Sequence, residues 1–217
     1  MRMYSPEWEA VKDMAYTPKV MDVQFDLSAG EIPADHGPTL CSEVLRHLPW
    51  LADTPDAAIH PVHGAPSGRN ANLVINRRVK LVLRLPLERI EVARALIGKT
   101  IDPGAGNLVV GDLKAKNLTP FGTLYSHFVT LGTADEAAIL EGVRARLNEM
   151  GIQCGLIPGM QRKMVSPDGE ISGHTLMLHD LNLVHSLAIQ EQGLGLHHLW
   201  GCGIFIPHKS IKEVSTV

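Results

Sequence analysis

Residues 193–203 decide how this chain folds, and they read Gly193-Leu194-Gly195-Leu196-His197-His198-Leu199-Trp200-Gly201-Cys202-Gly203. The four glycines form two Gly-x-Gly pairs separated by five residues, and a short apolar run ending at Pro207 follows at once. Because glycine has no Cβ, such a loop can turn sharply and present several peptide N–H groups to a phosphate. The two imidazoles in its middle add further donors. The pattern predicts an anion-binding loop that opens a strand.

Two other interpretations of this loop are possible. A dinucleotide-binding turn would follow a strand, open a helix and be followed about 20 residues later by an acidic residue. This loop instead follows an expected helix at 182–192, opens a strand, and has only 14 residues after it. The order of elements therefore excludes that class. A glycine-rich turn that binds no ligand remains the alternative.

The loop also carries a family resemblance. Its spacing, near the C-terminus and before an apolar strand, resembles the glycine-rich loop of the CRISPR-associated repeat-cleaving endoribonucleases. Residues 186–195 resemble that family's last helix running into the loop, while 23–27 and 32–37 resemble its first strand and the entry to its first helix. The resemblance extends from about residue 20 to residue 207. It implies a repeat-associated (RAMP) protein built on ferredoxin-like domains.

The order of expected elements predicts an α+β fold of two tandem ferredoxin-like (RRM-like) domains with a C-terminal glycine-rich loop. In the first domain we expect strands at 20–27, 72–75, 79–85 and 108–118, and helices at 38–48 and 87–97, with the second and third strands forming a hairpin. Residues 28–33 are expected to form a loop, and 59–64 a short edge strand or turn. In the second domain we expect strands at 123–131, 153–165, 170–178 and 204–207, and helices at 134–150 and 182–192. The predicted boundaries are an N-terminal extension over 1–19, a first domain over 20–118 and a second over 119–217.

Composition agrees with a soluble protein of 217 residues, of which 45% are hydrophobic. No apolar run approaches the roughly 18 to 20 residues that a membrane-spanning helix needs, and the first residues have no signal-peptide core. Cysteines occur only at 41, 154 and 202, which suggests neither a disulfide framework nor a zinc ribbon. We therefore expect a cytoplasmic protein with no membrane partner.

The overall charge is unusual for an RNA-binding protein. Twenty basic and 23 acidic residues give a formal net charge of −3, whereas free-standing nucleic-acid binders usually have a basic excess. Local clusters must then supply the positive charge. One cluster comprises Arg69, Arg77, Arg78, Lys80 and Arg84 with no acidic residue among them, and Arg162-Lys163 lie in an expected hairpin. Either cluster could equally be a solvated surface.

The resemblance implies cleavage of CRISPR repeat RNA without a metal or cofactor. The 2′-hydroxyl attacks the adjacent phosphorus, leaving a 2′,3′-cyclic phosphate and a 5′-hydroxyl end. This reaction requires a general base, a general acid and a cation that stabilises the phosphorane, and histidine can act as acid or base near neutral pH. The pairs His60-x-x-His63 and His197-His198 match no zinc signature, so no metal site is predicted.

In the family, the general-base histidine lies in the first helix or just after it, a window that here holds His36, His47, His60 and His63. We predict His60 first, because Ile59-His60 stands where many members carry an apolar-His pair. His36 is the second choice because it lies beside the start of the helix, and His47 is the third.

Many members also have a tyrosine in the first helix, and residues 40–47 contain none. Arg46, His47 or a loop residue would have to replace it, with Ser42 a weaker possibility. This difference keeps a second hypothesis open, namely a catalytically inactive subunit of the same fold that only binds crRNA. A third hypothesis is an unrelated metabolic enzyme on a ferredoxin-like scaffold, since this fold hosts many functions.

The predicted RNA contacts come from the loop and from the basic clusters. They are Gly193, Gly195, His197, His198, Gly201, Gly203, Arg162, Lys163, Arg77, Arg78 and Lys80. The hairpin with Arg162 and Lys163 is expected to hold the repeat stem by shape and charge. Trp200 could stack on an unpaired base or pack in the core. The expected partners are the repeat stem-loop and, after cleavage, the subunits of a CRISPR effector complex.

Overall fold

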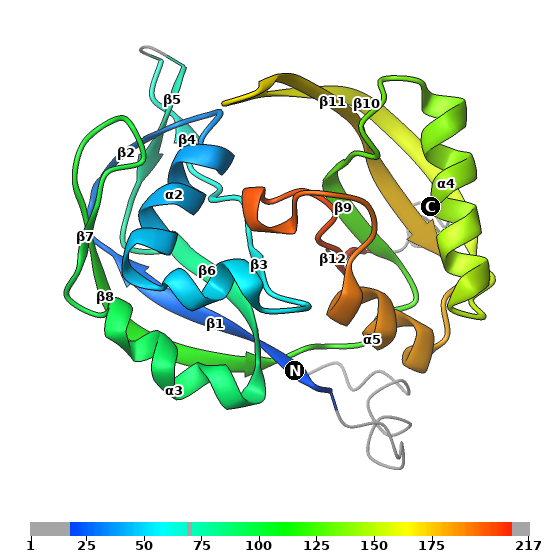
Figure 1. Ribbon diagram of the computed structural model, residues 1–217, viewed down its shortest axis with the longest axis horizontal. Helices are drawn as coiled ribbons and strands as arrows, with labels where there is room; N and C mark the ends of the chain where they lie inside the picture. Colours follow the sequence, from blue (N-terminus) through cyan, green and yellow to red (C-terminus); the bar gives the residue numbers. More distant parts are fainter. Residues whose placement is uncertain (1–17, 69–70, 210–217) are drawn as a thin grey trace, which may run out of the picture.

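Two curled antiparallel sheets lie side by side, and the glycine-rich loop runs between them (Figure 1). The computed structural model describes residues 18–68 and 71–209. Helices cover one face of each sheet, so each sheet has an apolar core on its helical side. Among the described residues, no helix combines the length and the apolarity needed to cross a bilayer. Arg69, a member of the basic cluster noted in the sequence, lies outside the described residues.

The first sheet has the strand order β3-β6-β1-β8-β7. Its strands are β1 (Val20–Leu27), β3 (Ala58–Ile59), β6 (Lys80–Pro86), β7 (Thr100–Ile101) and β8 (Leu108–Asn117). The helical segments are α2 (Gly37–His47), η1 (Pro49–Asp53), and a run formed by η2 (Leu87–Arg89), α3 (Ile90–Ala93) and η3 (Arg94–Leu96). The segment β8-β1-β6-β3 has the order of a ferredoxin-like sheet, as the sequence predicts.

The predicted hairpin of the first domain is wrong. β5 (Asn72–Ile75) does not pair with β6; it pairs with β2 (Gly30–Pro33) and β4 (Ala65–Pro66) in a separate three-stranded sheet. Residues 30–33, expected to be loop, therefore form a strand, and the Asn72 side chain donates a 2.8 Å hydrogen bond to Glu31 there. The place of the second ferredoxin strand is taken by β3, which pairs with β6 at Ile59 and Leu83. Local alternation identifies a strand but not its partner.

The second sheet confirms the predicted elements and their order, β10-β11-β9-β12. They are β9 (Leu124–Val129), α4 (Glu136–Glu149), β10 (Gly155–Ser166), β11 (Gly169–His179), α5 (Leu183–Gln192), η4 (His198–Trp200) and β12 (Ile206–Pro207). Asn182 caps α5 by accepting from the His185 N–H. In α4 the buried stripe runs through Ile139, Val143 and Leu147, whereas Ala138, for which helical spacing with Val143 and Leu147 predicts a place in that stripe, is exposed.

The loop joins the two units by packing against both. Leu194 and Phe205, on either side of it, belong to the core of the second unit. Leu199 and Trp200, from its middle, pack against the core of the first unit, which otherwise draws on residues 23–110. The predicted domain boundary at 118/119 stays a prediction, because this core already includes residues from the end of the chain.

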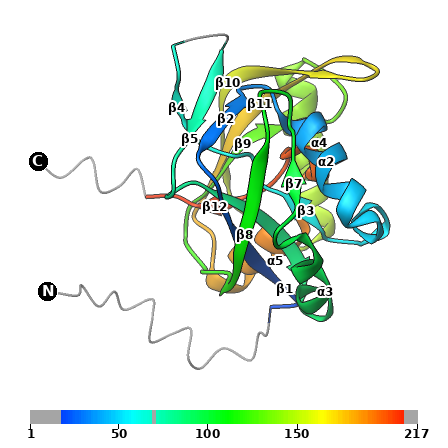
Figure 2. The same ribbon diagram turned by 90° about the vertical axis from the view of Figure 1, so that its left-hand side faces the viewer.

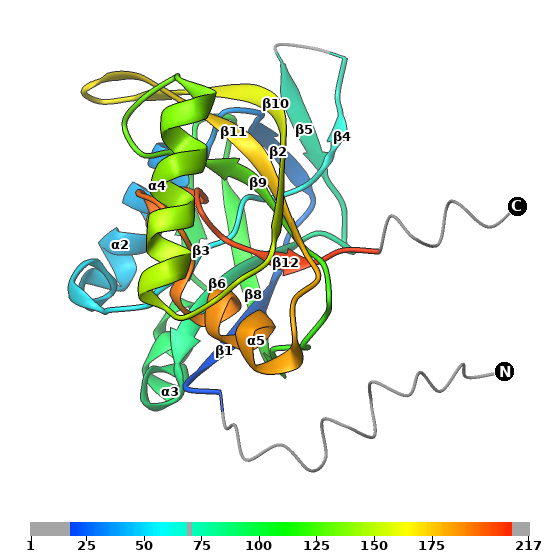
Figure 3. The ribbon, with the colours of Figure 1, turned by 90° about the vertical axis from the view of Figure 1, so that its right-hand side faces the viewer.

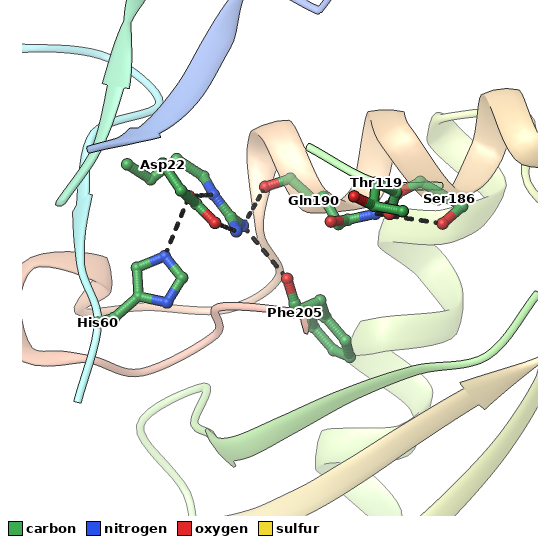
Figure 4. A network of polar contacts seen from close by, with 7 residues as sticks. Asp22, His60, Thr119, Ser186, Gln190 and Phe205 are labelled. Atoms are coloured by element: carbon green, nitrogen blue, oxygen red, sulfur yellow. Dashed lines mark hydrogen bonds and ion pairs between the residues drawn. The ribbon is translucent and has the colours of Figure 1, made fainter. Parts of the chain in front are cut away.

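A buried arginine also links the units (Figure 4). Arg84 on β6 is only 2% exposed, and its guanidinium donates two hydrogen bonds to the carboxylate of Asp22, its neighbour on β1, at 2.8 and 3.0 Å. The same group donates to the carbonyl oxygens of Gln190 (2.6 Å) and Phe205 (3.2 Å), which belong to the second unit. Arg84 belongs to the basic cluster that could have been a solvated surface, but α5 and the segment before β12 cover it here.

We expect Arg84→Met to destabilise the protein by about 3 to 5 kcal/mol, because the Asp22 carboxylate would remain buried without its partner. Urea unfolding measures this free energy. The control is Arg94→Met, which removes the exposed ion pair with Glu91 and should cost at most about 1 kcal/mol. Equal free energies of unfolding for the two variants would contradict a structural role for the Arg84 network.

Candidate functional site

A cavity of about 380 Å³ opens where the two units meet. The first unit contributes residues 34–37 at the start of α2, 61–63 after β3, and Leu73. The second unit contributes 127–128 from β9, 162–164 from β10, and 200–201 from the loop. Polar and cationic side chains from distant parts of the sequence thus face one space. Within the described ranges, no three His, Cys, Asp or Glu side chains are grouped as a metal ligand set.

His36 lies at the cavity wall but is used by the fold. It is 5% exposed, and its Nδ1 lies 2.8 Å from the carbonyl oxygen of Pro33 while its Nε2 accepts from the Val62 N–H at 2.9 Å. These partners require a neutral ring with its proton on Nδ1. Burial lowers the pKa of His36, which favours the same neutral form. His36 therefore connects the start of α2 to the segment after β3, and neither ring nitrogen is left for a substrate.

His60 lies deeper, in the Arg84 network, and does not line the cavity. Its Nε2 is 3.3 Å from the Asp22 carboxylate (Figure 4), although the contact lacks hydrogen-bond geometry. Burial lowers the pKa of His60. Burial alone would raise the pKa of Asp22, but His60 and Arg84 together hold it well below its usual range. The predicted role of His60 as the base stays a prediction, and its position gives it a structural contact.

Arg46 and His47 lie at the opposite end of α2 from the cavity. The helix has eleven residues, so its two ends are about 15 Å apart. The Arg46 guanidinium donates to Glu43 at 2.7 Å and to the Thr100 carbonyl oxygen at 3.1 Å, and His47 Nε2 lies 3.2 Å from that same oxygen. The structure does not bring these two residues together with the cavity.

His63 and His127 are the imidazoles that face the cavity without another engagement. Their ring centroids are 4.4 Å apart, and neither ring makes a hydrogen bond to the residues at 18–68 or 71–209. His63 is exposed and His127 is half-buried. Burial, and then the neighbouring charges of His63, Arg162 and His208, lower the pKa of His127 to about 4. His127 was not predicted; a histidine two residues after Tyr125 on one strand face was the only signal for it.

Two predicted cations also face the cavity, Arg162 and Lys163 on the β10–β11 hairpin. Lys163 is paired with Glu170 at 2.7 Å, whereas no ion pair within the described part of the chain engages Arg162. The hairpin is fixed against α2 by the Val165 N–H, which donates to the Asp35 carboxylate at 2.7 Å. The site therefore presents two imidazoles beside two cationic groups.

The other predicted cations lie elsewhere. Arg77 and Arg78 are exposed in the turn after β5 and do not line the cavity. Lys80 is paired with Asp26 at 2.5 Å and also donates to the carbonyl oxygen of Arg77. These three side chains do not line the cavity, and their contact with RNA stays a prediction.

Most N–H groups of the glycine-rich loop donate to carbonyl oxygens of the loop itself or of neighbouring segments. The N–H groups that donate to backbone carbonyls are those of Gly193, Leu194, Leu196, Trp200, Gly201, Cys202 and Gly203. At Gly203, φ is +66°, and a Cβ would collide with the Leu194 carbonyl oxygen and lie 2.9 Å from the His198 ring. The glycines thus let the backbone close tightly around the half-buried imidazole of His198. This geometry favours a packing role, and the predicted phosphate contact of the loop stays a prediction.

Trp200 was expected either to stack on an unpaired base or to pack in the core, and its position is compatible with both. Its ring is half-buried, packs against the first core and also lines the cavity. The exposed imidazole of His197 stacks on it, with ring centroids 4.3 Å apart and an interplanar angle of 4°. One face of the indole is therefore already occupied by His197.

Comparison with known proteins agrees with the resemblance noted in the loop. The family model described as Cas6 Crispr matches residues 21–210. This chain is a member of the Cas6 family. It is 31% identical over 188 residues to the CRISPR-associated endonuclease Cas6 of Myxococcus xanthus, covering 86% of this chain and 81% of that protein.

Solved structures of the Cas6 and RAMP type share the fold. An RAMP protein described as binding different RNA substrates has a TM-score of 0.66 at 14% identity, covering 87% of this chain and all of the other. A Cas6-related protein from Pyrococcus furiosus has a TM-score of 0.64 at 15% identity, covering 88% and 100%. The tandem ferredoxin-like fold predicted from the sequence is confirmed for this Cas6 protein.

The low pKa of His127 makes stability depend on pH. Between pH about 4 and 6.5 the folded protein leaves this imidazole neutral while the unfolded chain protonates it. Protonation therefore favours unfolding, so stability should fall as the pH drops through this interval, and less steeply in His127→Gln. Denaturant titrations at several pH values, with NMR titration of the imidazole, measure both effects. A His127 pKa of 6.5 or above in the free protein would contradict the structure.

Proposed function

We propose that this Cas6 protein is a metal-independent endoribonuclease that cleaves CRISPR repeat RNA at the cavity between its two units. The observation that carries the proposal is the pair of unengaged imidazoles, 4.4 Å apart, beside Arg162 and Lys163. Transphosphorylation needs two groups that exchange protons and a cation for the phosphorane. The name of the Myxococcus xanthus relative, an endonuclease, supports the same class of reaction.

In this proposal His63 is the general base. It takes the proton of the 2′-hydroxyl while the 2′ oxygen forms a bond to phosphorus and the bond from phosphorus to the 5′ oxygen breaks. His127 is neutral in the free protein, but a phosphate bound beside it favours its protonated form, which then donates to the leaving oxygen. Arg162 stabilises the negative charge of the phosphorane. The products are a 2′,3′-cyclic phosphate and a 5′-hydroxyl end.

The hairpin and the cavity also suggest how the RNA is held. Arg162 and Lys163 extend from β10 beside the cavity, so a repeat stem gripped by the hairpin would place the nucleotides at its base next to His63. The hairpin would keep this stem after cleavage. On this basis we propose that the protein retains the 3′ product and joins the subunits of an effector complex.

The alternative function is a catalytically inactive crRNA-binding subunit. The observations that favour it are the lack of a tyrosine in α2 and the structural engagement of His36 and His60. The two functions differ in cleavage and not in binding. An assay that follows both with one RNA therefore separates them.

We expect the purified protein to cleave the repeat RNA of its own array in EDTA and to leave the same RNA intact when the nucleotide before the cut is 2′-deoxy. The cyclic phosphate is identified by mass spectrometry of the upstream product. Tight binding without cleavage would support the inactive subunit. Loss of cleavage in EDTA, with recovery on adding a divalent cation, would overturn the metal-independent mechanism.

Single histidine variants then test the assignment. His63→Ala should reduce the single-turnover cleavage rate about 10²- to 10⁴-fold without changing the free energy of unfolding, because the ring is exposed. The variants His36→Ala and His60→Ala should instead lower stability, since their rings are buried and engaged. His47→Ala is the control and should change neither. Full activity in His63→Ala, or a specific loss of rate in stable His60→Ala, would return the base assignment to His60.

A further inference from the structure

A row of aromatic rings leads out of the cavity along the second sheet. It starts at His63 and His127 and continues to Tyr125, 4.9 Å from His127 between ring centroids, and to His208, 5.4 Å from Tyr125. We call these four side chains the ring row. The catalytic roles proposed above use only the two rings at the cavity, so Tyr125 and His208 have no part in that chemistry.

The backbone explains why these rings form a row. Tyr125 and His127 are two residues apart on β9, so both point to the same side of the sheet. β12 pairs with β9 at Leu124 and Pro207, which places His208 beside Tyr125, and the His208 N–H donates to the Thr123 carbonyl oxygen at 3.0 Å. Figures 2 and 3 place the end of β12 on the same side of the molecule as β4 and β5, and His63 comes two residues before β4 in the chain. The sheet therefore fixes the positions of Tyr125, His127 and His208, and the segment between β3 and β4 brings His63 to His127.

The exposure of the rings argues against a role in core packing. His63 and His208 are exposed, and Tyr125 and His127 are half-buried. Four rings that contact one another in tilted or edge-to-face geometry and still present surface to solvent gain little from burial. The neighbouring charge is cationic, since Arg162 lines the same cavity as His127 and lowers its pKa. The row thus combines exposed ring faces with positive charge, as stacking sites for single-stranded nucleic acid do.

We propose that the ring row binds the unpaired nucleotides of the RNA that adjoin the cleaved phosphate, by stacking bases on Tyr125 and His208. His127 belongs both to the row and to the cavity, so a strand leaving the cavity meets Tyr125 next and then His208. The inference rests on the proposed function only in taking RNA as the ligand. It assigns to the sheet of the second unit the single-stranded part of the substrate, while the hairpin holds the paired part.

The test uses an RNA octamer of adenosines with one central 2-aminopurine, so that neither cleavage nor the repeat sequence enters the result. Stacking quenches the 2-aminopurine fluorescence, and the titration also gives the Kd. We expect the double variant Tyr125→Leu, His208→Ala to lose the quenching and to raise the Kd about 5- to 30-fold. Tyr125→Phe, which keeps a ring, should bind as the wild type does. An abasic octamer of the same charge should bind the wild type and the double variant equally.

The matched control is His185→Ala, a histidine on α5 that is not part of the ring row. It should leave both the Kd and the quenching unchanged. Urea unfolding of the double variant establishes that it is folded; if it is not, His208→Ala alone is used, because that exposed side chain can be removed without affecting the core.

Unchanged octamer binding in the folded variant would overturn the proposal. An equal loss for the abasic octamer would also overturn it, because charge and not stacking would then be responsible. A wild-type protein that binds the octamer but cleaves no repeat RNA would refute the proposed nuclease activity and leave the ring row intact.

Discussion

The arrangement of the two units depends on one guanidinium. Arg84 is buried on the first sheet, neutralised by Asp22, and its remaining donors are satisfied by the carbonyl oxygens of Gln190 and Phe205 in the second unit. A buried cation must have all of its partners, because each missing hydrogen bond leaves charge without compensation. The second unit can therefore dock in the position that supplies those two carbonyls and in few others. The cavity, whose walls come from both units, has its shape set by this contact.

The residues around the cavity fall into two groups: those whose polar atoms already contact other parts of the fold, and those whose polar atoms do not. His36 and His60 contact partners that hold the first unit together. Most N–H groups of the glycine-rich loop donate to carbonyl oxygens within the loop or in neighbouring segments such as β9. His63, His127 and Arg162 line the same space, and none of them makes a hydrogen bond or ion pair with residues 18–68 or 71–209. A catalytic imidazole must be able to gain and lose a proton at the substrate, and a ring with both nitrogens bonded to backbone cannot do so without breaking those bonds. The unengaged side chains are the ones available for chemistry.

Much of the fold could be predicted from the sequence because the signals are local. In the second unit, alternation in β9, the Ser166–Gly169 turn and the Asn182 cap each specify their element within a few residues. The errors concern partners distant in sequence. Residues 72–75 have the pattern of a hairpin arm, yet they pair with 30–33, and Arg84 has the pattern of a surface residue, yet α5 covers it. The candidate site was predicted in part for the same reason: Arg162 and Lys163 follow from the hairpin, whereas the meeting of His63 with His127 depends on docking.

The packing of Leu199 and Trp200 against the first core has a consequence for how the protein is made. Synthesis proceeds from the N-terminus, so the ribosome completes residues 18–118 long before it adds the loop that fills part of their core. Until then Arg84 also lacks its carbonyl partners in the second unit, and α5 does not yet cover its side of the first sheet. The nascent N-terminal unit is therefore incompletely packed until the loop is in place. The loop also supplies Trp200 and Gly201 to the cavity wall, so the complete cavity forms only after the last part of the chain has been made.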